Sequence, residues 1–93
     1  MGFRVIWSED AVQDLRTIRH HYRETRGEDS AVLVMNDIYS RVDRLQELPL
    51  VQGTRLHGST RVLHHPPYLI HYRTDEVKQA VYIRRIKDGR RAG

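Results

Sequence analysis

Apolar residues in the first half of the chain recur at helical spacing, and those in the second half alternate with the period of a β-strand. The first helical face consists of Val12, Leu15, Ile18 and Tyr22. Ser8 precedes this stripe as a candidate N-cap, with two acidic residues after it in the first turn. Gly27 follows the stripe as a candidate C-cap. The pattern therefore predicts a helix from Ser8 to about Gly27.

A second and longer apolar stripe predicts a second helix, capped by Asp29 or Ser30 and ended by Pro49. Its members are Ala31, Val34, Met35, Ile38, Val42, Leu45 and Leu48. The two helices would form a hairpin whose apolar stripes face a common partner. Residues 50–59 contain two glycines, and we expect them to form a loop.

Four short segments have the composition and alternation of strands. They are residues 3–7, 61–64, 68–73 and 77–86. Pro66-Pro67 and Thr74-Asp75-Glu76 would supply the turns between the last three. The order predicts an α+β fold with an N-terminal strand, a helical hairpin and then three antiparallel strands. The helices would pack on one face of the sheet, and residues 1–93 would form a single domain.

Composition narrows the class of protein. The 93 residues are 39% hydrophobic and 30% charged, which is typical of a globular protein. No run approaches the ~20 apolar residues that cross a bilayer, so we expect no membrane partner. The segment before Ser8 is too short and too charged for a signal peptide, so we expect a cytoplasmic protein. The absence of cysteine excludes disulfides, thiolate metal sites and a cysteine nucleophile.

Charge is distributed unevenly along the chain. Residues 1–50 carry a net charge of −2, and residues 51–93 carry +6. The positive half ends in a cluster directly after the last predicted strand: Arg84, Arg85, Lys87, Arg90 and Arg91. In the simplest explanation, cations on a sheet edge discourage unwanted strand pairing and have no binding role. Most of this cluster is arginine, whose planar fork suits carboxylates and phosphates, so we favour binding of an acidic or polyanionic macromolecule.

A catalytic interpretation of the sheet stays open beside this one. Cutting RNA without a metal needs a base, an acid and cations around the phosphorane. Arg61, His71, Arg73 and Arg84 are the candidates, and strand alternation puts His71 and Arg73 on the same face. The simpler interpretation, which we prefer, is that these residues form a docking surface.

The histidines do not predict a metal site. His20-His21 and His64-His65 are sequence neighbours, which diverge on a helix and point to opposite faces of a strand. No phosphate-binding loop or nucleophile motif accompanies them. We therefore expect neither a metal nor a cofactor.

Taken together, several segments resemble the ParE/RelE superfamily of toxins over nearly the whole chain, from about residue 3 to residue 91. The likeness rests on Val5-Ile6-Trp7-Ser8 leading into Ala11, Asp14-Leu15 and Ile18, then Leu48-Pro49, Arg61 before Pro67-Tyr68, Tyr72-Arg73, and Ile83-Arg84-Arg85-Ile86 with Gly89-Arg90-Arg91. Members of this superfamily are the toxic halves of bacterial type II toxin–antitoxin pairs. The C-terminal segment of a cognate antitoxin wraps and silences each toxin.

The resemblance implies one of two targets. ParE-like members trap DNA gyrase, whereas RelE-like members enter the ribosome and cut messenger RNA. Pro67-Tyr68, Tyr72-Arg73 and the terminal Gly-Arg-Arg look more like ParE. Many relatives carry a histidine just before that Gly-Arg-Arg, and Asp88 stands here instead, which argues against RNA cleavage. Under the ParE-like hypothesis, no residue has a catalytic role.

The resulting expectation is a toxin that inhibits DNA gyrase by binding and is neutralised by an acidic antitoxin on the sheet edge or the helical hairpin. The target-binding candidates are Arg61, Arg73, Arg84, Arg85, Lys87, Arg90 and Arg91. The alternative is a ribosome-dependent endoribonuclease that uses Arg61, His71, Arg73 and Arg84.

Overall fold

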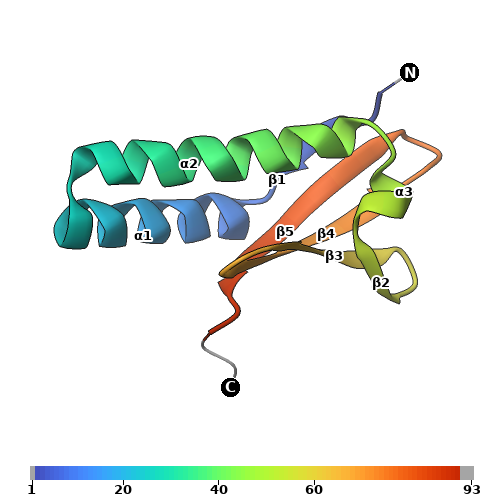
Figure 1. Cartoon of the computed structure of the whole chain (residues 1–93). Helices are drawn as coiled ribbons and strands as arrows, with labels where there is room; N and C mark the ends of the chain where they lie inside the picture. The colour runs from blue at the N-terminus through green and yellow to red at the C-terminus, as the bar shows by residue number, and fades with distance from the viewer. Residues whose placement is uncertain (1, 91–93) are drawn as a thin grey trace.

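A mixed sheet forms one layer of the protein, and a pair of antiparallel helices forms the other (Figure 1). Within residues 2–90, which this computed structural model describes, the sheet has five strands in the order β1-β5-β4-β3-β2. The strands are β1 (Arg4–Trp7), β2 (Thr54–His57), β3 (Thr60–His65), β4 (Tyr68–Asp75) and β5 (Ala80–Asp88). β1 runs parallel to β5, and all other neighbouring strands are antiparallel. The predicted α+β class is confirmed.

The first helix, α1 (Glu9–Arg26), begins and ends where the sequence predicts. The Ser8 hydroxyl accepts a hydrogen bond from the Ala11 N–H at 3.1 Å, which satisfies one of the unpaired donors of the first turn. Gly27 ends the helix with a φ of 93°, a left-handed value that other residues adopt rarely.

The second helix, α2 (Glu28–Asp43), differs from the prediction at both ends. Gly27 itself is its N-cap, so the helix starts before the predicted Asp29 or Ser30. Its α-helical part stops at Asp43, and the chain continues as a tighter 3₁₀ turn, η1 (Arg44–Gln46), that still buries Leu45 completely. Leu48 then adopts a left-handed backbone and is 70% exposed, so it does not extend the apolar stripe.

The segment predicted to be a loop contains two elements. Pro49 starts a short helix, α3 (Pro49–Gln52), in place of simply ending the previous one. A proline is well placed in a first helical turn, because its missing N–H would have no partner there. The edge strand β2 follows and pairs with β3. All four residues of β2 are exposed, so the alternation that reveals a half-buried strand is absent from its sequence.

The hairpin between β4 and β5 turns later than predicted. β4 extends through Asp75, and β5 begins at Ala80, three residues after the predicted start at Val77. The Asp75 carboxylate accepts a hydrogen bond from the Lys78 N–H at 3.0 Å, and Gln79 takes a left-handed φ of 52°. Val77 is 95% exposed at the tip of this turn.

The core lies between the two helices and the sheet face that they cover. The core residues with no exposed surface come from α1, α2, η1, β4 and β5, and they are Ala11, Ile38, Val42, Leu45, Ile70, Tyr72, Val81 and Ile83. Trp7 and Tyr82 are partly buried, as expected for sheet aromatics. Among the described residues, no helix is long and apolar enough to span a bilayer.

Candidate functional site

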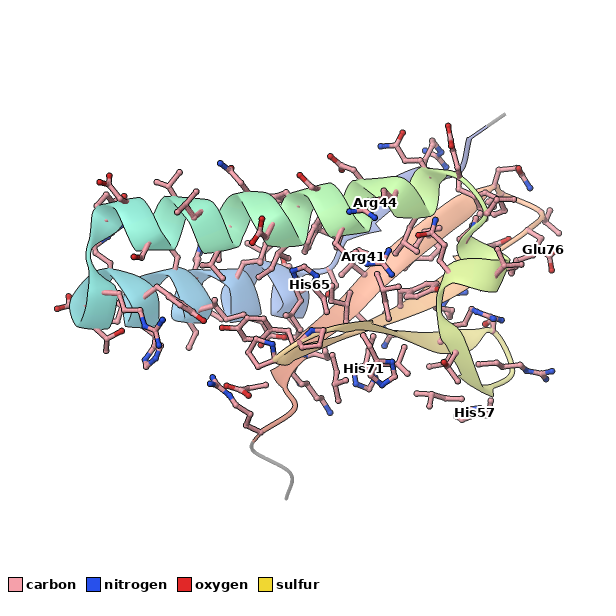
Figure 2. All side chains as sticks on the ribbon, in the orientation of Figure 1. Arg41, Arg44, His57, His65, His71 and Glu76 are labelled. Atoms are coloured by element: carbon pink, nitrogen blue, oxygen red, sulfur yellow. The ribbon has the colours of Figure 1, made fainter. Side chains whose placement is uncertain are left out.

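The sheet has one face against the helices and one face turned away from them, which we call the open face. β4 alternates along its whole length, with Tyr68, Ile70, Tyr72 and Thr74 buried against the helices. The intervening residues, Leu69, His71, Arg73 and Asp75, belong to the open face. Figure 2 shows the His71 ring directed away from the helices. The prediction that His71 and Arg73 share a face is confirmed.

Neighbouring strands add to the open face through their register, because directly paired residues project to the same side. Val62 pairs with His71, Tyr82 with Arg73, and Lys87 with Leu69. The Arg73 guanidinium lies over the Tyr82 ring, 4.5 Å from its centroid, in a cation–π contact. Arg73 is therefore held in place by the sheet that carries it.

His71 stands among cations on this face. Burial lowers its pKa below the ordinary value of 6.5, and the positive charges of Lys87 and Arg85 lower it further. The imidazole is consequently neutral at neutral pH, where the neighbouring cations keep their charge.

Arg61 lies on the opposite face from His71 and Arg73. It pairs with Tyr72, which is fully buried on the helix side. Its Nη2 donates to the Gly53 carbonyl at 2.9 Å, and the hydroxyl of the paired Tyr72 donates to the Pro49 carbonyl at 2.7 Å. Arg61 thus ties β3 to α3, and the structure does not bring the proposed catalytic quartet together.

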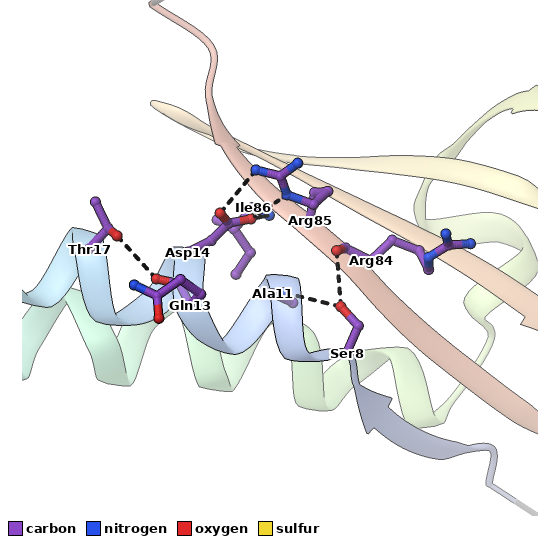
Figure 3. Close-up of polar contacts among 8 residues, drawn as sticks. All are labelled: Ser8, Ala11, Gln13, Asp14, Thr17, Arg84, Arg85 and Ile86. Carbon is purple, nitrogen blue, oxygen red and sulfur yellow. Dashed lines mark hydrogen bonds and ion pairs between the residues drawn. The ribbon is translucent and has the colours of Figure 1, made fainter.

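A bulge in β5 separates the roles of its two adjacent arginines. His71 pairs with Arg85 and Tyr72 with Ile83, so Arg84 is the extra residue on β5. Arg84 follows the buried Ile83 and points away from α1, as Figure 3 shows. Arg85 pairs with His71 and so starts on the open face, but its guanidinium reaches α1, where its Nε lies 2.8 Å from the Asp14 carboxylate.

Side chains of α1 also complete the edge of β5 beyond the end of β1. The Ser8 hydroxyl donates to the Arg84 carbonyl at 3.0 Å, and the Ile86 N–H donates to the Asp14 carboxylate at 2.8 Å (Figure 3). These two contacts replace the backbone pairing that β1 provides further back along the strand. They fix the position of residues 84–86 relative to the helices.

The remaining cations of the predicted cluster differ in their surroundings. The Arg90 guanidinium forms an ion pair with Asp88 at 2.8 Å, so the acid at the family's histidine position has a structural contact. Lys87 is exposed on β5. Arg91 lies outside the described residues. Arg85, Lys87 and Arg90 border a groove of about 700 Å³ between α1 and β5 that also contains Asp14 and Asp88.

A second groove, of about 520 Å³, runs along the seam between α1 and α2. Apolar side chains of both helices line it, and Arg16 and Arg19 stand among them. The apolar residues are Val12, Leu15, Val32, Met35 and Tyr39. Val32 and Tyr39 are 48% and 45% exposed, respectively, although both are large and apolar. Sequence reasoning missed these two because they lie outside the main stripe of the second helix.

The described histidines do not assemble a metal centre. Within residues 2–90, no three His, Asp or Glu side chains lie close enough together to hold a metal ion. His20 is 4.0 Å from Glu24 on the surface of α1, and His57 lies at the far end of the edge strand (Figure 2).

Solved structures of toxin–antitoxin proteins share this fold. A chain of the chromosomal ParDE toxin–antitoxin system from P. aeruginosa is 24% identical with a TM-score of 0.81, over 92% of this chain and 95% of that one. A chain of the RelBE2 toxin–antitoxin complex from Mycobacterium tuberculosis is 21% identical with a TM-score of 0.66, over 95% and 92%. A chain of the archaeal RelE–RelB complex from Pyrococcus horikoshii OT3 is 18% identical with a TM-score of 0.64, over 99% and 100%.

The sequence itself identifies the family. No match is found among curated proteins. Residues 5–93, however, match the family described as the ParE toxin of the type II toxin–antitoxin system parDE. The match spans almost the whole chain, from the second residue of β1 through the helices and the remaining strands of the sheet. The chain therefore belongs to the ParE family of type II toxin–antitoxin toxins.

Proposed function

We propose that this toxin inhibits DNA gyrase by binding it in the cytoplasm and performs no chemistry of its own. The observation that carries this proposal is the position of Arg61. It is turned to the helix side of the sheet and tied to Gly53, so it stands across the sheet from His71 and Arg73. The cations that remain outward-facing form a surface suited to docking.

The electrostatics of the open face also favour binding over cleavage. RNA cleavage requires an acid for the leaving oxygen as well as a base. His71 is neutral at neutral pH, and the acid nearest the end of β5, Asp88, is paired with Arg90. A neutral histidine among fixed cations can contribute to recognition without any proton transfer.

The target-binding candidates do not contribute equally. Arg84 and Lys87 are exposed on β5, and Arg73 is fixed over Tyr82, so these three carry the proposed contact. Arg85 and Arg90 are already paired with Asp14 and Asp88, respectively. Their part is therefore to hold the site in place, and not to contact the target. Arg61 supports the fold, and the role of Arg91 stays a prediction.

The test is a supercoiling assay with purified gyrase and the purified toxin, with linear DNA as a second readout. We expect loss of supercoiling and accumulation of linear DNA. Arg84→Ala with Lys87→Ala should weaken inhibition, whereas Arg44→Ala with Lys78→Ala removes the same charge from exposed positions elsewhere and should not. Unchanged supercoiling at a saturating dose of the wild-type toxin would refute the proposal.

We also propose that the groove between α1 and α2 receives the antitoxin. Its apolar lining and its two arginines suit an amphipathic helix with acidic residues along its polar side. The similar mycobacterial and archaeal structures are complexes of a toxin with its antitoxin, which supports an antitoxin partner here.

The antitoxin contact has its own test. Val32→Asp should weaken binding because it places a charge in the apolar groove, whereas Leu33→Asp changes an exposed residue outside the groove and should not. Arg16→Glu with Arg19→Glu should slow association and reduce its salt dependence, since charges at a rim act mainly on the association rate. An association rate independent of salt would contradict the acidic partner.

Ribosome-dependent cleavage of messenger RNA is the second candidate, because His71 and Arg73 do share the open face. His71→Ala would then abolish message cleavage in toxin-expressing cells, as measured by primer extension. Cut messages combined with normal supercoiling would replace the gyrase proposal with this one.

A further inference from the structure

The cations of the open face on β4 and β5 are separated from the exposed large apolar side chains of this protein. The exposed large apolar residues lie on α2, on α3 and its flanks, on β2 and at the tip of the β4–β5 turn. The apolar residues of the open face are covered instead: Val62 is only 7% exposed, and Leu69 is partly buried. The charged groups there are Arg73 and Lys87, Arg84 and Arg85 beside the β5 bulge, and Asp75 at the end of β4.

This separation distinguishes two kinds of partner. The centre of a protein–protein interface is apolar and aromatic, with few charged residues. Interfaces with nucleic acid are more polar and much more positively charged. The helix groove has the first composition, and the open face has the second.

We infer that the open face binds the phosphate backbone of duplex DNA directly, with Arg73, Arg84 and Lys87 as the contacting cations. The inference deepens the proposed function, because it makes the DNA held by gyrase part of the surface that the toxin contacts. Phosphate contacts of this kind carry no sequence information, so binding is independent of sequence.

The state of Tyr82 favours a duplex over a single strand. Single-stranded nucleic acids are held largely by stacking of their bases on exposed aromatic rings. The Arg73 guanidinium already covers one face of the Tyr82 ring at 4.5 Å, so that face is not free to stack on a base. A duplex keeps its bases stacked internally and presents phosphates, which require cations only.

The contacting cations are also well positioned. Arg73 is fixed over Tyr82, and the β5 bulge directs Arg84 outward while Arg85 is held by Asp14. Lys87 pairs with Leu69 on the adjacent strand, so it projects from the same face. The three side chains thus arise from two hydrogen-bonded strands near the middle of the sheet.

Phosphate binding would also change the protonation of His71. The charged groups around it are Lys87 and Arg85 on β5 and Arg73 two residues along β4, and its partner on β3 is the apolar Val62. A bound phosphate offsets these positive charges and raises the pKa of His71. Affinity for DNA therefore increases as the pH falls into the range where His71 takes up a proton, and His71→Gln removes that increase.

The experiment measures fluorescence anisotropy of a short labelled duplex titrated with the toxin alone, without gyrase, at several salt concentrations. Three phosphate contacts predict a slope of log K against log salt of about −2.7, which is about a 40-fold loss of affinity between 50 and 200 mM. Arg84→Ala with Lys87→Ala leaves one contact and a slope of about −0.9. The charge-matched control, Arg44→Ala with Lys78→Ala, keeps the wild-type slope.

Thermal unfolding of each variant verifies folding, and Arg73→Gln tests the third cation separately. Gyrase inhibition by a toxin that does not bind the duplex would overturn this inference and leave the proposed function intact. Binding that the control variant loses equally would also overturn it, because the contact would then be general charge attraction. Salt-dependent binding without gyrase inhibition would support it while refuting the gyrase proposal. A wild-type preference for single-stranded RNA over the duplex would overturn it in favour of RNA.

Discussion

The Asp14 carboxylate on α1 lies 2.8 Å from the Nε of Arg85 on β5, a residue 71 positions further along the chain. The same carboxylate accepts the Ile86 N–H at 2.8 Å. One side chain therefore holds both a guanidinium and a backbone donor of β5. The first helix and the basic end of the sheet act as one unit through this contact.

Removing the carboxylate should destabilise the fold more than removing its arginine partner. Asp14→Ala leaves the Ile86 N–H without its acceptor, and we expect a loss of about 1–3 kcal/mol in the free energy of unfolding. Arg85→Ala should lose less, because its ion pair is exposed to solvent and therefore weak. Urea denaturation measures both, and equal losses would contradict the role assigned to the Ile86 contact.

Ser8 caps α1 and also donates to the Arg84 carbonyl, and two variants separate these roles. Ser8→Ala removes both contacts and should cost about 1 kcal/mol or more. Ser8→Asp keeps the cap but cannot donate to a carbonyl, so we expect intermediate stability. Ser8→Thr retains both and serves as the control. If Ser8→Asp is as stable as the wild type in thermal unfolding, the contact with Arg84 contributes nothing.

Gly53 is required by the closeness of Tyr72 rather than by its own backbone. Its φ is −103°, which any residue can adopt, but a Cβ there would collide with the Tyr72 hydroxyl and ring. Gly53→Ala should therefore destabilise the fold by about 1–3 kcal/mol. Tyr72→Phe removes the hydroxyl, so Gly53→Ala should cost less in that background. A double-mutant cycle measures this coupling, and additive losses would show that the hydroxyl takes no part in the collision.

The pKa of His71 should depend on Lys87. Its pKa lies below 6.5, so near that pH the unfolded chain binds more protons than the folded one. Stability from this group is full above pH 6.5 and is lost as the pH falls through the lower folded pKa. Lys87→Ala should raise the pKa, as measured by NMR titration of the His71 ring, whereas Lys78→Ala should leave it unchanged. An identical titration in the Lys87 variant would exclude the charge effect.

The ends of α1 could be predicted from the sequence because their determinants are local. Ser8 and Gly27 act within one helical turn, and both occupy the predicted caps. Leu45 was likewise placed correctly in the core, although the backbone there is a 3₁₀ turn and not an α-helix. Periodicity predicts the buried face of a helix more reliably than it predicts the residue at which α-helical hydrogen bonding gives way to 3₁₀ hydrogen bonding.

The face of Arg61 could not be derived from its neighbours. Val62 and Leu63 are consecutive, apolar and both buried, so the pattern does not show which of them faces the helices. The edge strand β2 was missed for a related reason, since only its pairing with β3 defines it. The bulge that separates Arg84 from Arg85 is equally non-local, because it exists only in the register with β4.

The position of β5 between β1 and β4 has a consequence for synthesis of the protein. β1 is made first, yet its hydrogen-bonding partner on the sheet begins only at Ala80. A nascent chain that has not released β5 from the ribosomal exit tunnel therefore has an unpaired N-terminal strand and an incomplete sheet. The pairing that completes the sheet therefore joins the first and the last strands to be made, and it can form only once nearly the whole chain has been synthesised.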